Sequence, residues 1–148
     1  MKQQTGPTPP EPHAPSGDAL MALLGAAHHI EAQLEAALGV NGLSMAKFGV
    51  LEALSHASEP LTLTEVAAKI SCVRSNVTQL IDRLEADGLV RRAADATDRR
   101  SIRAVLTPLG TKRFAQGAAA FAQVRSELAA RLPESERADF LKVLSGLV

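Results

Sequence analysis

The chain has 148 residues, of which 46% are hydrophobic and 22% charged, and this composition suits one domain with its own core. Basic and acidic residues number 16 each, so the net charge of zero gives no sign of a nucleic-acid partner. A single cysteine, Cys72, excludes an intrachain disulfide and an all-cysteine zinc site. No apolar run approaches the length of a membrane span and no signal peptide is recognisable, so we expect a cytoplasmic protein without a membrane partner.

The first 17 residues are predicted to form a disordered tail. Five of the eight prolines lie in residues 1–15, and this segment has no apolar periodicity with which to bury itself. The other prolines, Pro60, Pro108 and Pro133, each stand where an apolar pattern stops or restarts. They separate the predicted elements of residues 18–148.

Two helices are predicted within residues 18–57. Apolar residues recur at helical spacing from Asp18, and Gly39 supplies a plausible helix stop. Ser44 can cap the second helix, which ends before the turn at residues 58–60.

Residues 61–106 are predicted to form a winged helix-turn-helix. Thr62 and Glu65 make a threonine-x-x-glutamate capping box that opens a short helix of about two turns. Another helix follows residues 71–73 and ends at Gly88, which permits a left-handed stop. Two short strands then follow, at Leu89-Val90 and between Ile102 and Leu106, and the polar residues 94–101 between them form the tip of a hairpin, the wing.

Two further helices are predicted in residues 107–148. Thr107 and Pro108 resemble a cap followed by proline at the first helical position, and the last helix follows Pro133. The long amphipathic helices at both chain ends have too little to pack against within one chain, which indicates a shared dimer interface. The expected fold class is mainly α with a small β-hairpin wing, in which helices of 18–57 and 107–148 serve as dimerisation and scaffold helices.

The second helix of a helix-turn-helix lies in the major groove and presents its solvent-facing side chains to base edges. Asparagine and glutamine can bond adenine bidentately, arginine can bond guanine, and hydroxyls reach bases or phosphates. The alternative is an ordinary polar, solvated helix face. The predicted DNA-contacting residues of this helix are Arg74, Ser75, Asn76, Thr78, Gln79 and Arg83.

The predicted wing loop carries Asp98, Arg99 and Arg100 at its tip. Arginines on a protruding loop suit a narrow minor groove, where the negative potential is strongest. The alternative is a solvated charged turn in which Asp98 pairs with an arginine. Further arginines, expected to add to the positive charge of this module, are Arg91, Arg92 and Arg103.

Three motifs make the sequence resemble the MarR-type (multiple-antibiotic-resistance regulator) transcriptional regulators. They are Leu84-Glu85-x-x-Gly88-Leu89-Val90-Arg91, Asp98-Arg99-Arg100 and Leu106-Thr107-x-x-Gly110. The resemblance, which extends over residues 18–148, implies a homodimer with interlocked terminal helices, with recognition helices in successive major grooves and Arg100 in the minor groove. It also implies autoregulation or repression that a small ligand relieves. Such a dimer would bind a pseudopalindromic operator with half-site centres about 10 bp apart.

Two positions depart from the family's pattern. Family members often have a hydroxyl residue at the recognition-helix cap, where this chain has Val73, so Ser71 or Ser75 would have to serve. Peroxide-sensing members use a cysteine near the start of the first helix, whereas Cys72 lies in the turn between the paired helices. Cys72 is either a small buried hydrophobe or a redox switch.

In this family, effectors often bind in the crevice between the dimerisation helices and the DNA-binding lobe. The residues that the resemblance places near this crevice are His28, His29, Phe48 and His56. Adjacent histidines on one helix point about 100° apart, so His28 and His29 do not face the same small site. A zinc site would need a carboxylate such as Glu31 or Glu52 beside a histidine, and no tight ligand spacing supports it. Ordinary partly exposed histidines are the other interpretation.

An enzyme is not expected, because the sequence has no glycine-rich phosphate loop, nucleophile elbow or HExxH pair. We therefore predict no catalytic residues, no cofactor and no metal site. The predicted partners are double-stranded operator DNA, a second copy of the chain and a small-molecule effector. Metal or redox control of the same fold, and a winged-helix module that binds proteins, are the alternatives.

Overall fold

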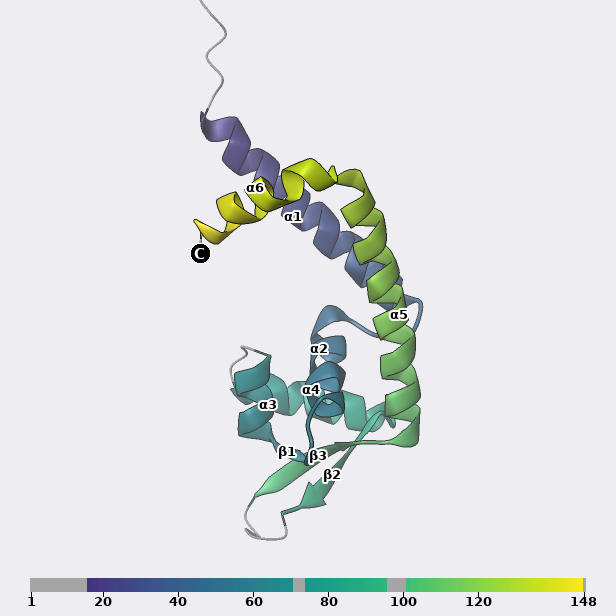
Figure 1. Ribbon diagram of the computed structural model, residues 1–148. Coiled ribbons are helices and arrows are strands. Elements are labelled where there is room, and N and C mark those ends of the chain that lie inside the picture. The colour runs from purple at the N-terminus through teal and green to yellow at the C-terminus, as the bar shows by residue number, and fades with distance from the viewer. Residues whose placement is uncertain (1–15, 71–73, 96–100, 148) are drawn as a thin grey trace, which may run out of the picture. The chain divides into compact units, whose positions relative to one another are not determined.

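A computed structural model describes residues 16–70, 74–95 and 101–147 (Figure 1). These residues belong to two compact units, divided after Glu31 within the first helix. Most of the predicted tail, residues 1–15, lies outside the description. The elements are α1 (Ser16–Gly39), α2 (Met45–Ser55), β1 (Leu61–Thr62), α3 (Leu63–Lys69), α4 (Arg74–Ala86), β2 (Val90–Ala94), β3 (Ile102–Leu106), α5 (Pro108–Arg131) and α6 (Glu134–Ser145).

Helix α1 ends at Gly39, the predicted stop, and the turn to α2 passes through Gly42. Gly39 is the last residue of α1, whereas Gly42 has a φ of 70° and so occupies the left-handed region that side chains disfavour. Gly42 N–H donates to Gly39 O over 2.9 Å. The predicted cap of α2 is confirmed, since Ser44 Oγ accepts a hydrogen bond of 3.2 Å from Lys47 N–H.

The capping box at the start of α3 forms as predicted. Glu65 N–H donates to Thr62 Oγ1 over 3.2 Å, and Glu65 Oε2 accepts from Thr62 N–H over 2.7 Å. These reciprocal bonds satisfy two backbone donors that a helix start leaves without partners, and they therefore fix where α3 begins.

The hairpin belongs to a three-stranded antiparallel sheet with the order β1-β3-β2. Strand β2 pairs with β3 from Val90↔Leu106 to Ala94↔Ile102, so it runs further than the predicted Leu89-Val90 pair. The sequence analysis missed β1, whose Leu61 pairs with Ala104, because two residues are too few to show alternation. Through β1, the wing is hydrogen-bonded to the segment that leads into α3.

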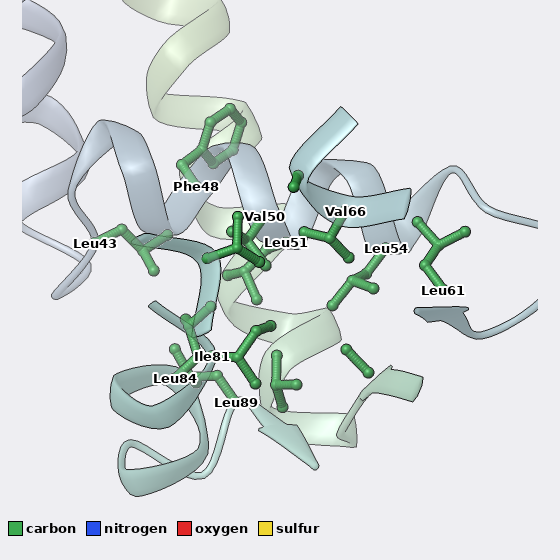
Figure 2. Close-up of a cluster of buried hydrophobic side chains, with 14 of the residues drawn as sticks. Leu43, Phe48, Val50, Leu51, Leu54, Leu61, Val66, Ile81, Leu84 and Leu89 are labelled. Carbon is green, nitrogen blue, oxygen red and sulfur yellow. The ribbon is translucent and has the colours of Figure 1, made fainter. Parts of the chain in front are cut away.

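The hydrophobic core joins α2, α3 and α4 to the sheet, as the side chains in Figure 2 show. Val50 and Leu51 from α2 and Val66 from α3 have no solvent exposure. On the far side of the core, α5 packs on α2 through the ring of Phe48, whose centroid lies 5.7 Å from that of Phe114 and 5.6 Å from that of Phe121. The core therefore holds α2 between α5 and the pair α3 and α4.

The start of α5 is joined to the end of α4 by an unusually close backbone approach. Thr107 N–H donates to Leu89 O over 3.1 Å, and Thr107 Oγ1 donates to Gly88 O over 2.7 Å while it accepts from Gly110 N–H. A Cβ on Gly110 would overlap the carbonyl oxygen of Leu89. The motif Leu106-Thr107-x-x-Gly110 therefore builds the junction between the sheet and α5.

Candidate nucleic-acid interface

Helix α4 buries one face and exposes the other. Val77, Ile81 and Leu84 have no exposure to solvent and anchor the helix in the core. Asn76, Gln79 and Arg83 are exposed and, at spacings of three and four residues, lie along one side of the helix. Thr78 is also exposed. Arg74 and Ser75 lie in the first turn, but their side chains are outside the description.

A second exposed strip of α4 is acidic and is bound by an arginine of the wing. Arg92 on β2 donates to Asp82 Oδ1 and to Glu85 Oε2, each over 2.5 Å, and its backbone N–H donates to Glu85 Oε1 over 3.0 Å. The bonds to the Arg92 backbone and guanidinium hold the pKa of Glu85 below its ordinary value, and the bond to Asp82 raises the pKa of Arg92. The wing thus neutralises carboxylates that would otherwise repel a phosphate backbone.

The base of the wing is held by Arg103. Its Nε donates to Asp95 Oδ2 over 2.6 Å, and its Nη1 donates to Pro60 O over 2.5 Å. Asp95 is only 7% exposed, so its charge is held in a largely desolvated position. Glu65 lies 3.9 Å from the same guanidinium. One side chain thereby links β3, the end of β2 and the start of α3.

These ion pairs correct one prediction. Arg92 and Arg103 were expected to add positive charge to the DNA-binding module, but each is engaged by carboxylates of this chain. Lys47 likewise pairs with Asp87 over 2.6 Å at the end of α4. Within the described segments, Arg83 and Arg91 are exposed and form no ion pair. Arg91 was not among the predicted DNA-contacting residues. It is next to Arg92 on β2, and neighbouring residues of a strand point to opposite faces.

The low pKa of Glu85 makes a testable contribution to stability. Because this pKa is lower in the folded state, the contribution is complete above the unfolded-state pKa of about 4.3 and disappears as the pH falls through the folded value. We expect Glu85→Gln to flatten the loss of stability below about pH 5, measured by urea unfolding at a series of pH values. Glu59→Gln, in an exposed loop, is the control, and equal pH profiles for the two variants would contradict this assignment.

The predicted effector residues fall in different places. His28 and His29 are exposed on α1 and belong to the unit that ends at Glu31. Phe48 is 5% exposed and lies in the aromatic stack, whereas His56 is exposed and its ring is nearly perpendicular to that of Phe114, with the two centroids 5.9 Å apart. His56 also borders an open cleft of about 600 Å³ between α2, the end of α3 and α4. Phe48 does not line this cleft.

The described segments contain neither a metal-binding cluster nor a helix that could span a membrane. Among residues 16–70, 74–95 and 101–147, no three histidine, cysteine, aspartate or glutamate side chains group closely enough to hold a metal ion. No helix in this part of the chain is long and apolar enough to cross a membrane. Cys72, Val73 and the wing residues Asp98, Arg99 and Arg100 lie outside the described segments.

Comparisons with known proteins agree with this arrangement. A sequence profile described as the MarR family matches residues 41–101. AbsC of Streptomyces coelicolor, a MarR family transcriptional regulator, is 27% identical, with a TM-score of 0.78 over 88% of this chain and 90% of that one. The chain is therefore similar to the MarR family. The matched residues run from the turn after α1 to the residue before β3, so the match covers the helix-turn-helix and β2 but not β3.

Two further proteins are similar to this chain, one in its fold and one in part of its sequence. CouR of Rhodococcus jostii RHA1, solved with p-coumaroyl-CoA, is 24% identical, with a TM-score of 0.73 over 91% of this chain and 94% of that one. The HTH-type transcriptional regulator YkoM of Bacillus subtilis, itself uncharacterized, is 36% identical over 72 residues, which are 49% of this chain and 46% of YkoM. The match therefore spans about half the length of that curated relative.

Proposed function

We propose that this MarR family chain is a sequence-specific DNA-binding transcriptional regulator, a homodimeric repressor of a pseudopalindromic operator that responds to a small molecule. The observation that carries the proposal is the surface of α4. Its exposed Asn76, Gln79 and Arg83 follow one side of a helix whose opposite face is fully buried. A rigid helix with amide and guanidinium groups on its outer side suits the major groove, where these groups can distinguish bases.

The charge distribution around α4 supports the same function. The carboxylates of Asp82 and Glu85 are held by Arg92, and that of Asp87 by Lys47. Arg83 and Arg91 stay exposed and without an ion pair among the described residues. The acidic residues near α4 are thus neutralised inside the protein, and the remaining arginines can meet phosphates.

Exposed apolar side chains on the terminal helices support a homodimer. Helix α6 has no buried residue, and its Phe140, Leu141 and Val143 are 43%, 61% and 63% exposed. On α1, Leu20 and Met21 are 58% and 66% exposed. Apolar surface of this kind marks interaction sites, and a second copy of the chain offers the same surface in return. A monomer by light scattering at micromolar concentration would contradict this part of the proposal.

Control by a small molecule is supported by two observations. CouR, a solved structure with a similar fold, binds p-coumaroyl-CoA. In this chain, an open cleft of about 600 Å³ lies against α4. A molecule that binds a DNA-binding and a DNA-free state with different affinities shifts the balance between them.

The test is whether the protein binds the DNA that flanks its own gene. Electrophoretic mobility shifts and footprinting measure this binding. The Arg99→Ala/Arg100→Ala variant is expected to bind about 10- to 100-fold more weakly, because two wing cations would no longer contact the DNA. Its affinity should also fall less steeply with salt, by about two in the slope of log K against log salt concentration.

The matched control is Arg125→Ala/Arg131→Ala, which removes the same charge from the exposed surface of α5, away from the sheet. We expect this variant to keep the wild-type affinity. If the wing variant bound as tightly as wild type with the same salt slope, the wing would have no DNA contact. If the wild-type chain bound none of the flanking DNA and instead retained a protein partner, a protein-interaction module would replace the proposed function.

A further inference from the structure

Arg92 joins the wing to α4 at a point midway along β2. Its guanidinium donates to Asp82 Oδ1 and to Glu85 Oε2, each over 2.5 Å, and its backbone N–H donates to Glu85 Oε1 over 3.0 Å. The two acceptors stand three residues apart and are therefore neighbours on the surface of α4. A guanidinium presents its donors in a fixed fork, so bonds to two carboxylates hold its position as well as its charge.

A short turn also connects α4 with β2. Gly88 has a φ of 71°, a conformation that allows the chain to reverse sharply after the helix. Leu89 N–H donates to Leu84 O over 2.9 Å, and Val90 is only 2% exposed in the core. These contacts hold the first residue of β2, whereas Arg92 binds α4 two residues further along the strand.

The arginine of the partner strand holds the wing on another side. Arg103 on β3 donates to Asp95, at the end of β2, and to the carbonyl oxygen of Pro60, just before β1. Both bonds lie on the side of β1 and α3. Strand β2 is the one that packs beside α4, and Arg92 projects from it. The two arginines therefore brace the wing in different directions, and Arg92 provides the brace toward α4.

The length of β2 makes the angle at the turn important. From Gly88 to Ala94 the chain spans about 20 Å, at about 3.3 Å per residue. A rotation of about 10° at the turn would move the end of β2 by about 3.5 Å, which is close to the distance between successive base pairs in DNA. A restraint beyond the turn is therefore needed if α4 and the wing are to meet DNA in one fixed register.

We propose that Arg92 is a positioning residue that fixes the angle between the wing and α4, and with it the number of base pairs between their contacts on one half-site. This inference rests on the proposed function, in which α4 enters the major groove and the wing the minor groove. Arg92 acts through the two elements that it joins. The neutralisation of Asp82 and Glu85 is a separate effect, and the two effects give different results when the carboxylates are removed.

The variant Asp82→Ala/Glu85→Ala separates position from charge. It removes the bonds of Arg92 to α4 and two negative charges near the DNA. If Arg92 acted through charge alone, this variant would bind DNA more tightly and would still require the wild-type spacing between the two contacts. We expect instead that it tolerates a changed spacing, because the wing can then take several angles to α4.

The measurement compares two duplexes in binding titrations with the full chain. One is the flanking DNA that footprinting shows to be protected, and the other has one base pair inserted between the major-groove and minor-groove contacts of each half-site. Wild type should bind the altered duplex at least about tenfold more weakly, as expected when a base-pair contact is lost. Asp82→Ala/Glu85→Ala should bind the two duplexes within about threefold of each other.

A second variant keeps the charge of Arg92 and changes only its shape. Arg92→Lys retains a cation, but a single ammonium cannot form the fork that meets both carboxylates. We expect it to tolerate the inserted base pair as well. The matched control is Arg125→Lys, the same exchange on the exposed surface of α5, which should keep the wild-type preference. If thermal melting shows that the alanine variant does not fold, Arg92→Lys carries the test.

The angle itself can be measured without DNA. Nitroxide labels are attached through Asn76→Cys and Ala94→Cys, two exposed positions on α4 and β2, in a chain that also carries Cys72→Ser. Labelled chain is diluted with unlabelled chain, so that electron–electron resonance reports distances within one copy. We expect a narrow distribution with Arg92 and one that is broader by about 3 Å or more with Arg92→Lys, from the length of the strand.

The two measurements tell failure of this inference from failure of the proposed function. If the chain binds none of its flanking DNA but Arg92→Lys broadens the distance distribution, the proposed function fails and the brace between β2 and α4 stands. Equal distance distributions with Arg92 and with Arg92→Lys would overturn the inference. So would an equal preference for the original spacing in wild type and in both variants, because the angle would then be set elsewhere.

Discussion

Replacing Gly110 with alanine is expected to lower the free energy of unfolding by about 3 kcal/mol or more. The new Cβ would overlap the carbonyl oxygen of Leu89 and lie 2.9 Å from its carbonyl carbon. Backbone atoms cannot rotate away as a side chain can, so the first turn of α5 would have to move off the end of α4. That movement would also break the hydrogen bonds of Thr107 to Gly88 and Leu89. Urea unfolding followed by circular dichroism measures the loss.

The matched control for this variant is Gly49→Ala, the same substitution inside another helix. Its Cβ meets only Ile70 at 3.8 Å, so we expect the opposite sign, a gain of about 0.5–1 kcal/mol from improved helix propensity. The pair separates a close backbone approach from the general effect of glycine in a helix. Equal unfolding free energies for the two variants would show that α5 does not lie this close to Leu89.

Replacing Arg103 with methionine is expected to destabilise the chain by about 3 kcal/mol. Asp95, at 7% exposure, would keep its charge in a largely desolvated position without the guanidinium that now lies 2.6 Å away. The bond to Pro60 O would be lost as well, and with it a link between β3 and the segment before β1. The wing base would loosen, so affinity for DNA should fall together with stability. Chemical unfolding and DNA titration of the same preparation test both effects.

Two further variants identify the cause. Arg91→Met removes an exposed arginine of the neighbouring strand that forms no ion pair with the described residues, and should change stability by less than about 0.5 kcal/mol. Asp95→Asn/Arg103→Met removes both charges and should recover part of the lost stability, because no buried charge is left. A double variant that is no more stable than Arg103→Met alone would show that the ion pair is not the cause.

The helix boundaries could be predicted from the sequence because their determinants are local. The side chains of Ser44, Thr62 and Thr107 each accept a hydrogen bond from a backbone N–H three residues later, and that spacing is visible in the sequence. The buried face of α4 was predictable for the same reason, since apolar residues at helical spacing must share one side. The resemblance to the MarR family rested on these local patterns and on the wing motif.

Features that depend on pairing between distant residues could not be predicted. Arg92 on β2 binds Asp82 and Glu85 on α4. A count of charges in the sequence does not show which residues form ion pairs. Strand β1 exists because Leu61 lies against Ala104, 43 residues later, and not because of its own sequence. The cleft beside Gly49 is equally invisible, because it is formed by three helices whose packing no periodic pattern specifies.

The internal pairing of carboxylates around α4 has a kinetic consequence. The paired acidic residues are Asp82, Glu85, Asp87 and Asp95. Each pair acts at a distance as a dipole, and its field is screened within about 8–10 Å at physiological salt. A chain of zero net charge therefore exerts little long-range attraction on DNA. We expect the encounter to proceed at a nearly unsteered rate, so that the lifetime of the complex, and not the rate of arrival, carries most of its sensitivity to salt.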